Sequence, residues 1–219
     1  MQREAIRKTG RAKVTPNLGD YAAERLDFDW GRARARLDGL PGGGLNIAHE
    51  AVVRQAHGPR RDHVAIRWRA KAGTHRDLTY GDLDAATNRF ANVLRSLGVE
   101  AGDRVYTLLG RVPDLHIAVL GALKLGAVVS PLFSAFGPEP VRQRLVLGDA
   151  RVLVTTAALY RRKVEPIRDQ VPGLAHVLLV GSDEYDRLLA DAADAFEIAP
   201  TEPEQLALLH FTSGTTGTP

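Results

Sequence analysis

The residue types best suited to chemistry lie at the carboxyl-terminal end of the sequence. Residues 206–211 form an apolar run that predicts a strand, and residues 212–219 are hydroxyl side chains and glycines with one final proline. Glycine lets the backbone turn its N–H groups toward one point, and Ser and Thr hydroxyls add donors without bulk. Such a loop at a strand end predicts a binding site for phosphate groups. The alternative that composition leaves open is a flexible tail rich in Ser, Thr and Gly.

Composition and charge exclude several other classes of protein. The 219 residues are 44% hydrophobic and 25% charged, which is ordinary for a globular chain. With no cysteine, the sequence has no disulfides, thiolate metal sites or thiol nucleophiles. The net charge of +3 is spread among interleaved acids and bases, so we expect no nucleic-acid partner. The seven histidines show no spacing typical of a metal site.

The sequence also predicts where the protein works. It has no run of about 18 apolar residues, so we expect no membrane span. The basic first residues lack the apolar segment of a secretory signal. A cytoplasmic location is therefore expected.

Strand and helix patterns alternate along most of the chain. Alternation of this kind predicts an α/β fold with a largely parallel sheet. Residues 1–45 are expected to be an irregular leader, and residues 46–219 an α/β domain. The predicted strands are residues 63–69, 104–109, 127–131, 151–155, 177–181 and 206–211. The predicted helices are residues 46–56, 80–97, 114–125, 138–147, 159–170 and 185–193.

Local signals support several of these boundaries. Asn46 is a plausible N-cap for the first helix, and Thr79 with Asp82 three residues later is close to a capping box. Gly98 follows the second helix, as a C-terminal capping glycine does. The helix over residues 114–125 is apolar nearly all round, which predicts a buried element.

Several segments resemble one family. Residues 211–219 read Phe-Thr-Ser-Gly-Thr-Thr-Gly-Thr-Pro, residues 43–46 read Gly-Gly-Leu-Asn, and residues 133–139 read Phe-Ser-Ala-Phe-Gly-Pro-Glu. These segments resemble the AMP-forming superfamily of acyl-CoA synthetases, adenylation domains and luciferases. The leader and the residue 133 segment are most similar to the acetate–CoA ligases within it. The loop at residues 212–219 is not the Walker A pattern, because Gly-x-x-x-x-Gly-Lys is absent.

The resemblance implies a fold, a reaction and site residues. It implies an incomplete N-terminal domain of the adenylate-forming enzyme fold. The reaction would join acetate to MgATP as acetyl-AMP with release of pyrophosphate, and coenzyme A (CoA) would then displace AMP. It assigns Phe133 and Arg161 to CoA, and no catalytic residue or metal ligand to this stretch. The residues it assigns to the ATP phosphates are Thr212, Ser213, Gly214, Thr215, Thr216 and Gly217.

Alternatives accompany these expectations. Phe133 could instead pack in the core, and Arg161 could be a solvated helix residue whose role passes to Arg162 or Lys163. Members of the family are much longer than this chain, so we expect a piece that is cut inside the phosphate loop and lacks complete ligase activity. A missing carboxyl-terminal portion or a complementary chain would then be needed. Other acyl-CoA ligases, an adenylation-domain piece, a non-catalytic nucleotide or CoA module, and a split-protein partner remain open.

Overall fold

The computed structural model describes residues 18–198 and 200–212, in two compact units. The first unit is Met1–Asp38, and it contains the helices α1 (Tyr21–Asp27) and α2 (Trp30–Arg34). The side chain of Asp20 caps α1 and that of Asp29 caps α2, each by accepting backbone N–H groups of the first turn. The stretch expected to be irregular is therefore partly helical.

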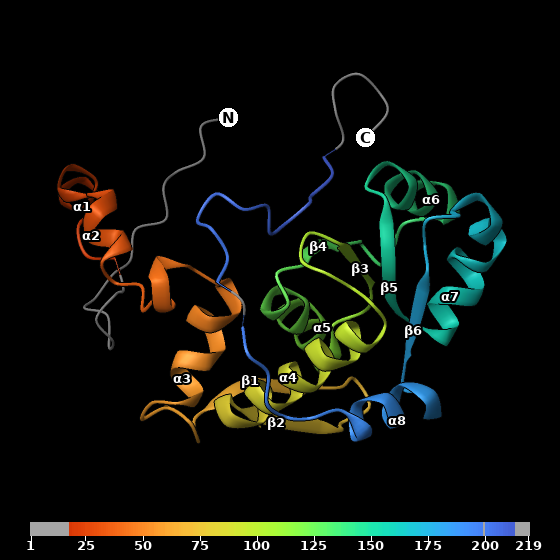
Figure 1. Ribbon diagram of the computed structural model, residues 1–219, viewed down its shortest axis with the longest axis horizontal. Helices are drawn as coiled ribbons and strands as arrows, with labels where there is room; N and C mark the ends of the chain where they lie inside the picture. Colours follow the sequence, from red (N-terminus) through yellow and green to blue (C-terminus); the bar gives the residue numbers. More distant parts are fainter. Residues whose placement is uncertain (1–17, 199, 213–219) are drawn as a thin grey trace, which may run out of the picture. The chain divides into compact units, whose positions relative to one another are not determined.

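The second unit, Gly39–Pro219, is built on a four-stranded sheet (Figure 1). The strand order is β4-β3-β5-β6, and every neighbouring pair is parallel. This arrangement confirms the predicted α/β fold. The strands are β3 (Arg104–Leu108), β4 (Val128–Pro131), β5 (Ala150–Thr156) and β6 (His176–Val180). The helices that follow them are α5 (Pro113–Lys124), α6 (Pro138–Leu147), α7 (Ala157–Lys163) with the 3₁₀ turn η3 (Glu165–Gln170), and α8 (Asp183–Asp191).

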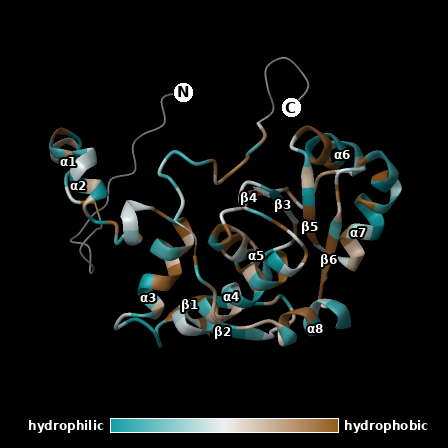
Figure 2. Cartoon of the chain, viewed as in Figure 1, coloured by the Kyte–Doolittle hydropathy of each residue, from teal (hydrophilic) through white to brown (hydrophobic). Residues whose placement is uncertain are grey.

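Helices cover both faces of this sheet. Val105 and Val129 point to one face, where they pack against apolar residues of α4 (Tyr80–Ser96), α5 and α8. Tyr106 and Leu153 point to the other face, against α6 and η3. The side chains of successive strand residues thus pack into the helical layers on opposite faces of the sheet, as strand geometry requires. The apolar colour of β5 and β6 between more polar helices is visible in Figure 2.

An antiparallel hairpin precedes α4. It consists of β1 (Val64–Arg69), which was predicted, and β2 (His75–Thr79), which was not. The first three residues of β2 are His, Arg and Asp with exposed side chains, so no apolar alternation marks the strand. Thr79 ends β2 and also caps α4: its hydroxyl accepts the Asp82 N–H at 3.1 Å, while the Asp82 carboxylate accepts the Thr79 N–H at 2.9 Å. The predicted capping box is confirmed.

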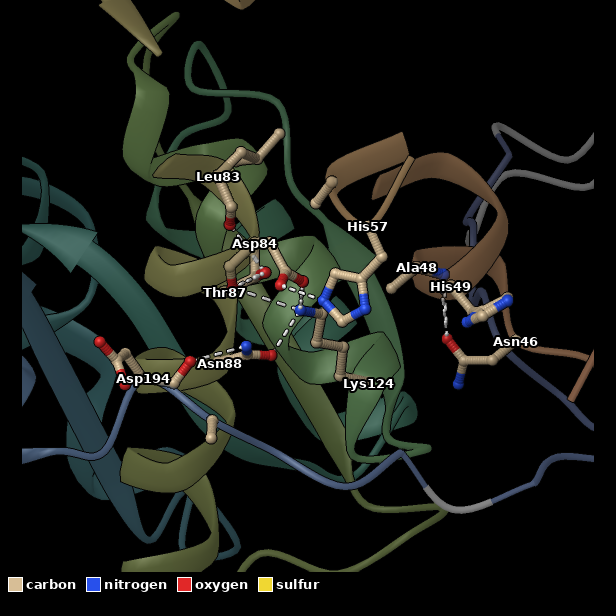
Figure 3. Close-up of polar contacts among 12 residues, drawn as sticks. Asn46, Ala48, His49, His57, Leu83, Asp84, Thr87, Asn88, Lys124 and Asp194 are labelled. Atoms are coloured by element: carbon tan, nitrogen blue, oxygen red, sulfur yellow. Dashed lines mark hydrogen bonds and ion pairs between the residues drawn. The ribbon is translucent and has the colours of Figure 1, made fainter. Parts of the chain in front are cut away.

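A buried polar cluster joins α4 to α5 (Figure 3). Lys124 is fully buried, and its Nζ donates to Asp84 Oδ1 at 2.6 Å and to Asn88 Oδ1 at 2.5 Å. His57 Nε2 lies 3.4 Å from the second oxygen of Asp84. Burial lowers the pKa of Lys124, and the Asp84 carboxylate opposes that shift. The helix predicted to be nearly all apolar therefore ends in a buried ion pair.

The same cluster fixes the chain that leads back to the sheet. Asn88 Nδ2 donates to Asp194 O at 2.8 Å, and Asn92 Nδ2 donates to Ala193 O and Ala195 O at 2.8 and 2.9 Å. These bonds hold the backbone after α8 along α4. Polar side chains of α4 thus position the connecting segment by hydrogen bonds to its backbone carbonyls.

Two predicted helices are irregular. The helix after Asn46 contains the π-helical turn η2 (His49–Val53) before α3 (Arg54–Ala56), although Asn46 caps it by accepting the Ala48 and His49 N–H groups. The 3₁₀ turn η1 (Pro41–Gly43) precedes this segment. The helix predicted over residues 159–170 is divided into α7 and η3, because Pro166 lacks the N–H that a continuous α-helix needs.

The strand predicted over residues 206–211 is wrong in extent. Only Leu208 forms a parallel bridge, with Val129 of β4. Val129 N–H donates to Ala207 O at 3.0 Å, and Leu209 N–H donates to Val129 O at 2.9 Å. The next bond of a parallel ladder would need an N–H on Pro131, which has none. The pairing therefore stops after two hydrogen bonds.

Among the described residues, the helices are all too short or too polar to cross a lipid bilayer.

Candidate functional site

The site predicted from the sequence falls at the carboxyl edge of the sheet. β3 and β4 are parallel neighbours, so the chain leaves both at the same edge. After β3 it continues into α5 on one face, and after β4 into α6 on the other. In open α/β sheets, ligands commonly bind where adjacent strand ends diverge in this way.

Thr212 reaches this same edge. Leu208 forms a parallel bridge with Val129 of β4. Phe211, which directly precedes Thr212, packs against the same apolar cluster as Phe136 of the loop after β4. The predicted phosphate-binding segment thus begins beside the loop after β4. Of its predicted residues Thr212 is described and exposed, whereas Ser213, Gly214, Thr215, Thr216 and Gly217 lie outside the described residues.

Phe133 is presented at the surface of that loop. Its side chain is 65% exposed, so it does not pack in the core formed by the described residues. It contacts Phe136 edge to face, with ring centroids 5.8 Å apart. An exposed aromatic ring held by a second ring offers a stacking surface for a planar ligand.

The basic residues of α7 divide into two kinds. Arg161 is exposed, and among the described residues its guanidinium makes no hydrogen bond or ion pair. Arg162 is also exposed, and its Nε donates to Ala158 O at 3.3 Å. Lys163 Nζ donates to Ser134 O at 2.6 Å and to Phe136 O at 2.5 Å. Lys163 therefore holds the loop that carries Phe133, and it is not an equivalent substitute for Arg161.

A further cation lies beneath the edge, and the sequence analysis missed it. Arg144 of α6 is only 8% exposed, and its guanidinium carbon lies 4.3 Å from the Phe136 ring centroid and 5.9 Å from that of Phe211. The signal in the sequence was its position three residues after Val141, which places both on the buried side of α6. A charged residue at an apolar helix position is a cue for a buried contact.

Tyr106 of β3 fixes the backbone beside Arg144. Its hydroxyl donates to Arg144 O at 2.9 Å. Burial raises the pKa of Tyr106, which keeps the phenol protonated and able to donate at neutral pH. Gly148, at the end of α6, makes room for this contact: a Cβ there would overlap the Tyr106 hydroxyl and lie 2.8 Å from Leu209 Cδ2.

The part of the chain that is described has no set of side chains that could bind a metal ion. Within it, His, Asp and Glu side chains form no group of three or more that could hold a metal ion.

Comparison with known proteins gives consistent similarities. The chain is 37% identical over 212 residues to the acetyl-coenzyme A synthetase of Bacillus subtilis (strain 168), a match that covers 93% of this chain and 36% of that protein. It is 30% identical over 241 residues to the 3-hydroxypropionyl-coenzyme A synthetase of Metallosphaera sedula, covering 98% and 36%. The chain thus spans about a third of the length of the curated relatives it matches.

Solved structures agree with this similarity. The crystal structure of Brucella canis acyl-CoA synthetase superimposes with a TM-score of 0.80 at 31% identity, covering 91% of this chain and 37% of that one. The fold is therefore that of part of an acyl-CoA synthetase, as expected from the sequence. The AMP-binding enzyme family matches residues 52–219, and the chain belongs to that family.

Proposed function

We propose that this chain supplies the ATP-phosphate contacts and part of the CoA contacts of an AMP-forming acyl-CoA synthetase, with acetate as the acyl substrate. The observation that supports the proposal is the parallel bridge of Leu208 with Val129 of β4, together with the packing of Phe211, next to Thr212, against the same apolar cluster as Phe136. Membership of the AMP-binding enzyme family supports the nucleotide part of the proposal.

The proposed reaction has two displacements. In the first, a carboxylate oxygen of acetate attacks the α-phosphorus of MgATP, the bond to the bridging oxygen breaks, and pyrophosphate leaves with acetyl-AMP formed. In the second, the CoA thiol loses its proton and its sulfur attacks the acetyl carbon, and AMP leaves with the bonding electron pair. Transfer of this kind depends mainly on positioning and on stabilisation of phosphate charge.

Residues of this chain would position the phosphates. We assign the ATP phosphates to Thr212 and to the segment that follows it, Ser213, Gly214, Thr215, Thr216 and Gly217. Hydroxyl and backbone N–H donors in a glycine-rich segment suit phosphate oxygens, and they add no fixed charge of their own. The β- and γ-phosphates are the proposed partners, so that pyrophosphate is held as it leaves.

CoA would bind at the same edge of the sheet, next to the loop after β4 and to α7. The exposed Phe133 ring offers a stacking surface for the adenine of CoA. Arg161 has a guanidinium that is free of hydrogen bonds within the described residues, and its planar donor fork suits CoA phosphates. Lys163 supports the loop from below through the two backbone carbonyls.

Acetate is the finer part of the proposal. Its support is the higher identity to an acetyl-coenzyme A synthetase, 37%, than to a 3-hydroxypropionyl-coenzyme A synthetase, 30%. ATP–pyrophosphate exchange tests it directly, because exchange requires only the first displacement. In the native protein purified from its own cells, acetate should stimulate exchange more than 3-hydroxypropionate does. The reverse order would indicate that 3-hydroxypropionate is the preferred acyl substrate.

Nucleotide binding tests the phosphate assignment. Isothermal titration of the 219-residue chain should give tighter binding of MgATP than of AMP, because AMP lacks the β- and γ-phosphates. Thr212→Ala should weaken ATP binding by about tenfold or more, because a hydrogen bond to a charged group contributes about 1.5–3 kcal/mol, and should leave AMP binding unchanged. Thr74→Ala in the turn between β1 and β2 is the matched control. Equal affinities for ATP and AMP would refute the assignment.

The CoA assignment has its own titration. Arg161→Ala and Phe133→Ala should each weaken CoA and leave ATP binding unchanged. The neighbouring Arg162→Ala serves as a control, because the Arg162 side chain already bonds its own helix backbone. If Arg162→Ala had the larger effect, the CoA role would move to that residue.

A further inference from the structure

Arg144 is a buried cation without an acidic partner. Its side chain is only 8% exposed, and within residues 18–198 and 200–212 it forms no ion pair with a carboxylate. Buried charges are usually paired, because removal from water is costly. The buried guanidinium of Arg144 must therefore be stabilised by contacts other than an ion pair.

Two aromatic rings provide that stabilisation. The guanidinium carbon lies 4.3 Å from the Phe136 ring centroid and 5.9 Å from the Phe211 ring centroid. Both distances are within the range of cation–π attraction, which is strongest where water is excluded. Nη1 also donates to Pro140 O at 2.9 Å, which fixes the orientation of the plane. The guanidinium therefore contacts two rings that are 75 residues apart in the sequence.

Each ring belongs to a different half of the proposed site. Phe136 contacts Phe133 edge to face at 5.8 Å, and Lys163 holds the carbonyl of Phe136 itself. Phe211 directly precedes Thr212, where the phosphate-binding segment begins. Pairing with β4 ends at Leu209, so the ladder does not fix Phe211. The contact with Arg144 is thus a point that holds Phe211 beyond the end of the ladder.

We propose that Arg144 is a positioning residue that ties Phe211, and with it Thr212, to the loop carrying Phe133, so that the nucleotide and CoA sides of the site are organised together. Arg144 acts through the two rings and touches neither ligand. The inference rests on the proposed function for its consequence in binding, but the structural tie itself can be tested without any ligand.

The ligand-free test uses nuclear magnetic resonance of the 219-residue chain. Arg144→Met removes the charge and the planar group while keeping an unbranched side chain. It should shift both the Thr212 amide resonance and the Phe133 ring resonances. Arg142→Met is the matched control on the same helix, because Arg142 pairs with Glu139 at the surface. Absence of a shift at Thr212, or an equal shift in the control, would overturn the proposal.

The binding test separates positioning from simple loss of folding. Arg144→Met should weaken both ATP and CoA about tenfold, which corresponds to about 1.4 kcal/mol. Arg144→Lys keeps the charge but not the planar stacking, and should recover part of the loss. In a double-mutant cycle, Phe211→Leu should add little in the Arg144→Met background. Additive effects, or weakening of one ligand alone, would overturn the coupling.

The two hypotheses fail differently. If the parent chain binds no ATP, the proposed function fails, and the ligand-free resonances still decide the role of Arg144. If Arg144→Met does not fold, as judged by circular dichroism, Arg144→Lys and Phe211→Leu carry the same test: each should shift the Phe133 ring resonances, and unshifted resonances would refute the tie.

Discussion

Substitution of Lys124 by Met is expected to destabilise the second unit strongly. The ammonium is fully buried, with Asp84 Oδ1 at 2.6 Å and Asn88 Oδ1 at 2.5 Å. Removal of one member of a buried pair leaves the other charge without its partner and typically costs about 3–5 kcal/mol. We expect about 3 kcal/mol, the lower end of that range, because Asp84 keeps His57 at 3.4 Å.

Urea unfolding followed by circular dichroism would measure this loss. Lys71→Met is the matched control, since Lys71 is exposed and should change the free energy of unfolding by less than about 0.5 kcal/mol. The double variant Asp84→Asn, Lys124→Met removes both charges, so it should be more stable than the sum of the single losses predicts. A loss below about 1 kcal/mol for Lys124→Met, or strict additivity in the double variant, would refute the reasoning.

Three further predictions concern α4 and its contact with α5. Thr79→Ala removes the hydroxyl of the capping box and should cost about 1 kcal/mol in urea unfolding; no loss would mean that the cap is not stabilising. The hydrogen bond from the Thr79 N–H lowers the pKa of Asp82, so the stability it contributes is present above about pH 4 and is lost as the pH falls through the lower folded-state pKa. Asp82→Asn should therefore flatten the acid side of a stability–pH profile, and an unchanged profile would contradict this. Gly121→Ala should cost about 1–3 kcal/mol, because its Cβ would lie 2.9 Å from both Phe90 Cδ1 and Thr87 O; Gly110→Ala, in open space, is the control.

Much of the sheet could be predicted because its signals are local. β3, β5 and β6 are short apolar runs between helical patterns, and the capping box before α4 lies within four residues. The phosphate-binding prediction used the same kind of information, namely loop chemistry after an apolar run. The strands and the capping box depend on neighbours in the sequence, which is why the residues alone were sufficient for them, whereas the phosphate-binding segment stays a prediction.

The features that could not be predicted depend on distant partners. The charges of Lys124 and Arg144 suggest exposure, but Asp84 stabilises the first, and two phenylalanines the second. Apolar character predicted a full strand over residues 206–211, whereas its length is set by Pro131 on another segment. Sequence periodicity does not indicate which strand a segment at the edge of a sheet will pair with.

Pro131 has a consequence for the dynamics of this edge. Leu209 N–H is the last amide of its segment that is bonded to β4. Hydrogen–deuterium exchange should therefore be slow at Leu209 and fast at Phe211, because only every second amide of such a segment points toward β4 and local opening is set by these bonds. Pro131 of β4 thus determines where the segment that leads to Thr212 stops forming backbone hydrogen bonds with the sheet. Its replacement by Ala would be expected to carry protection further toward Thr212.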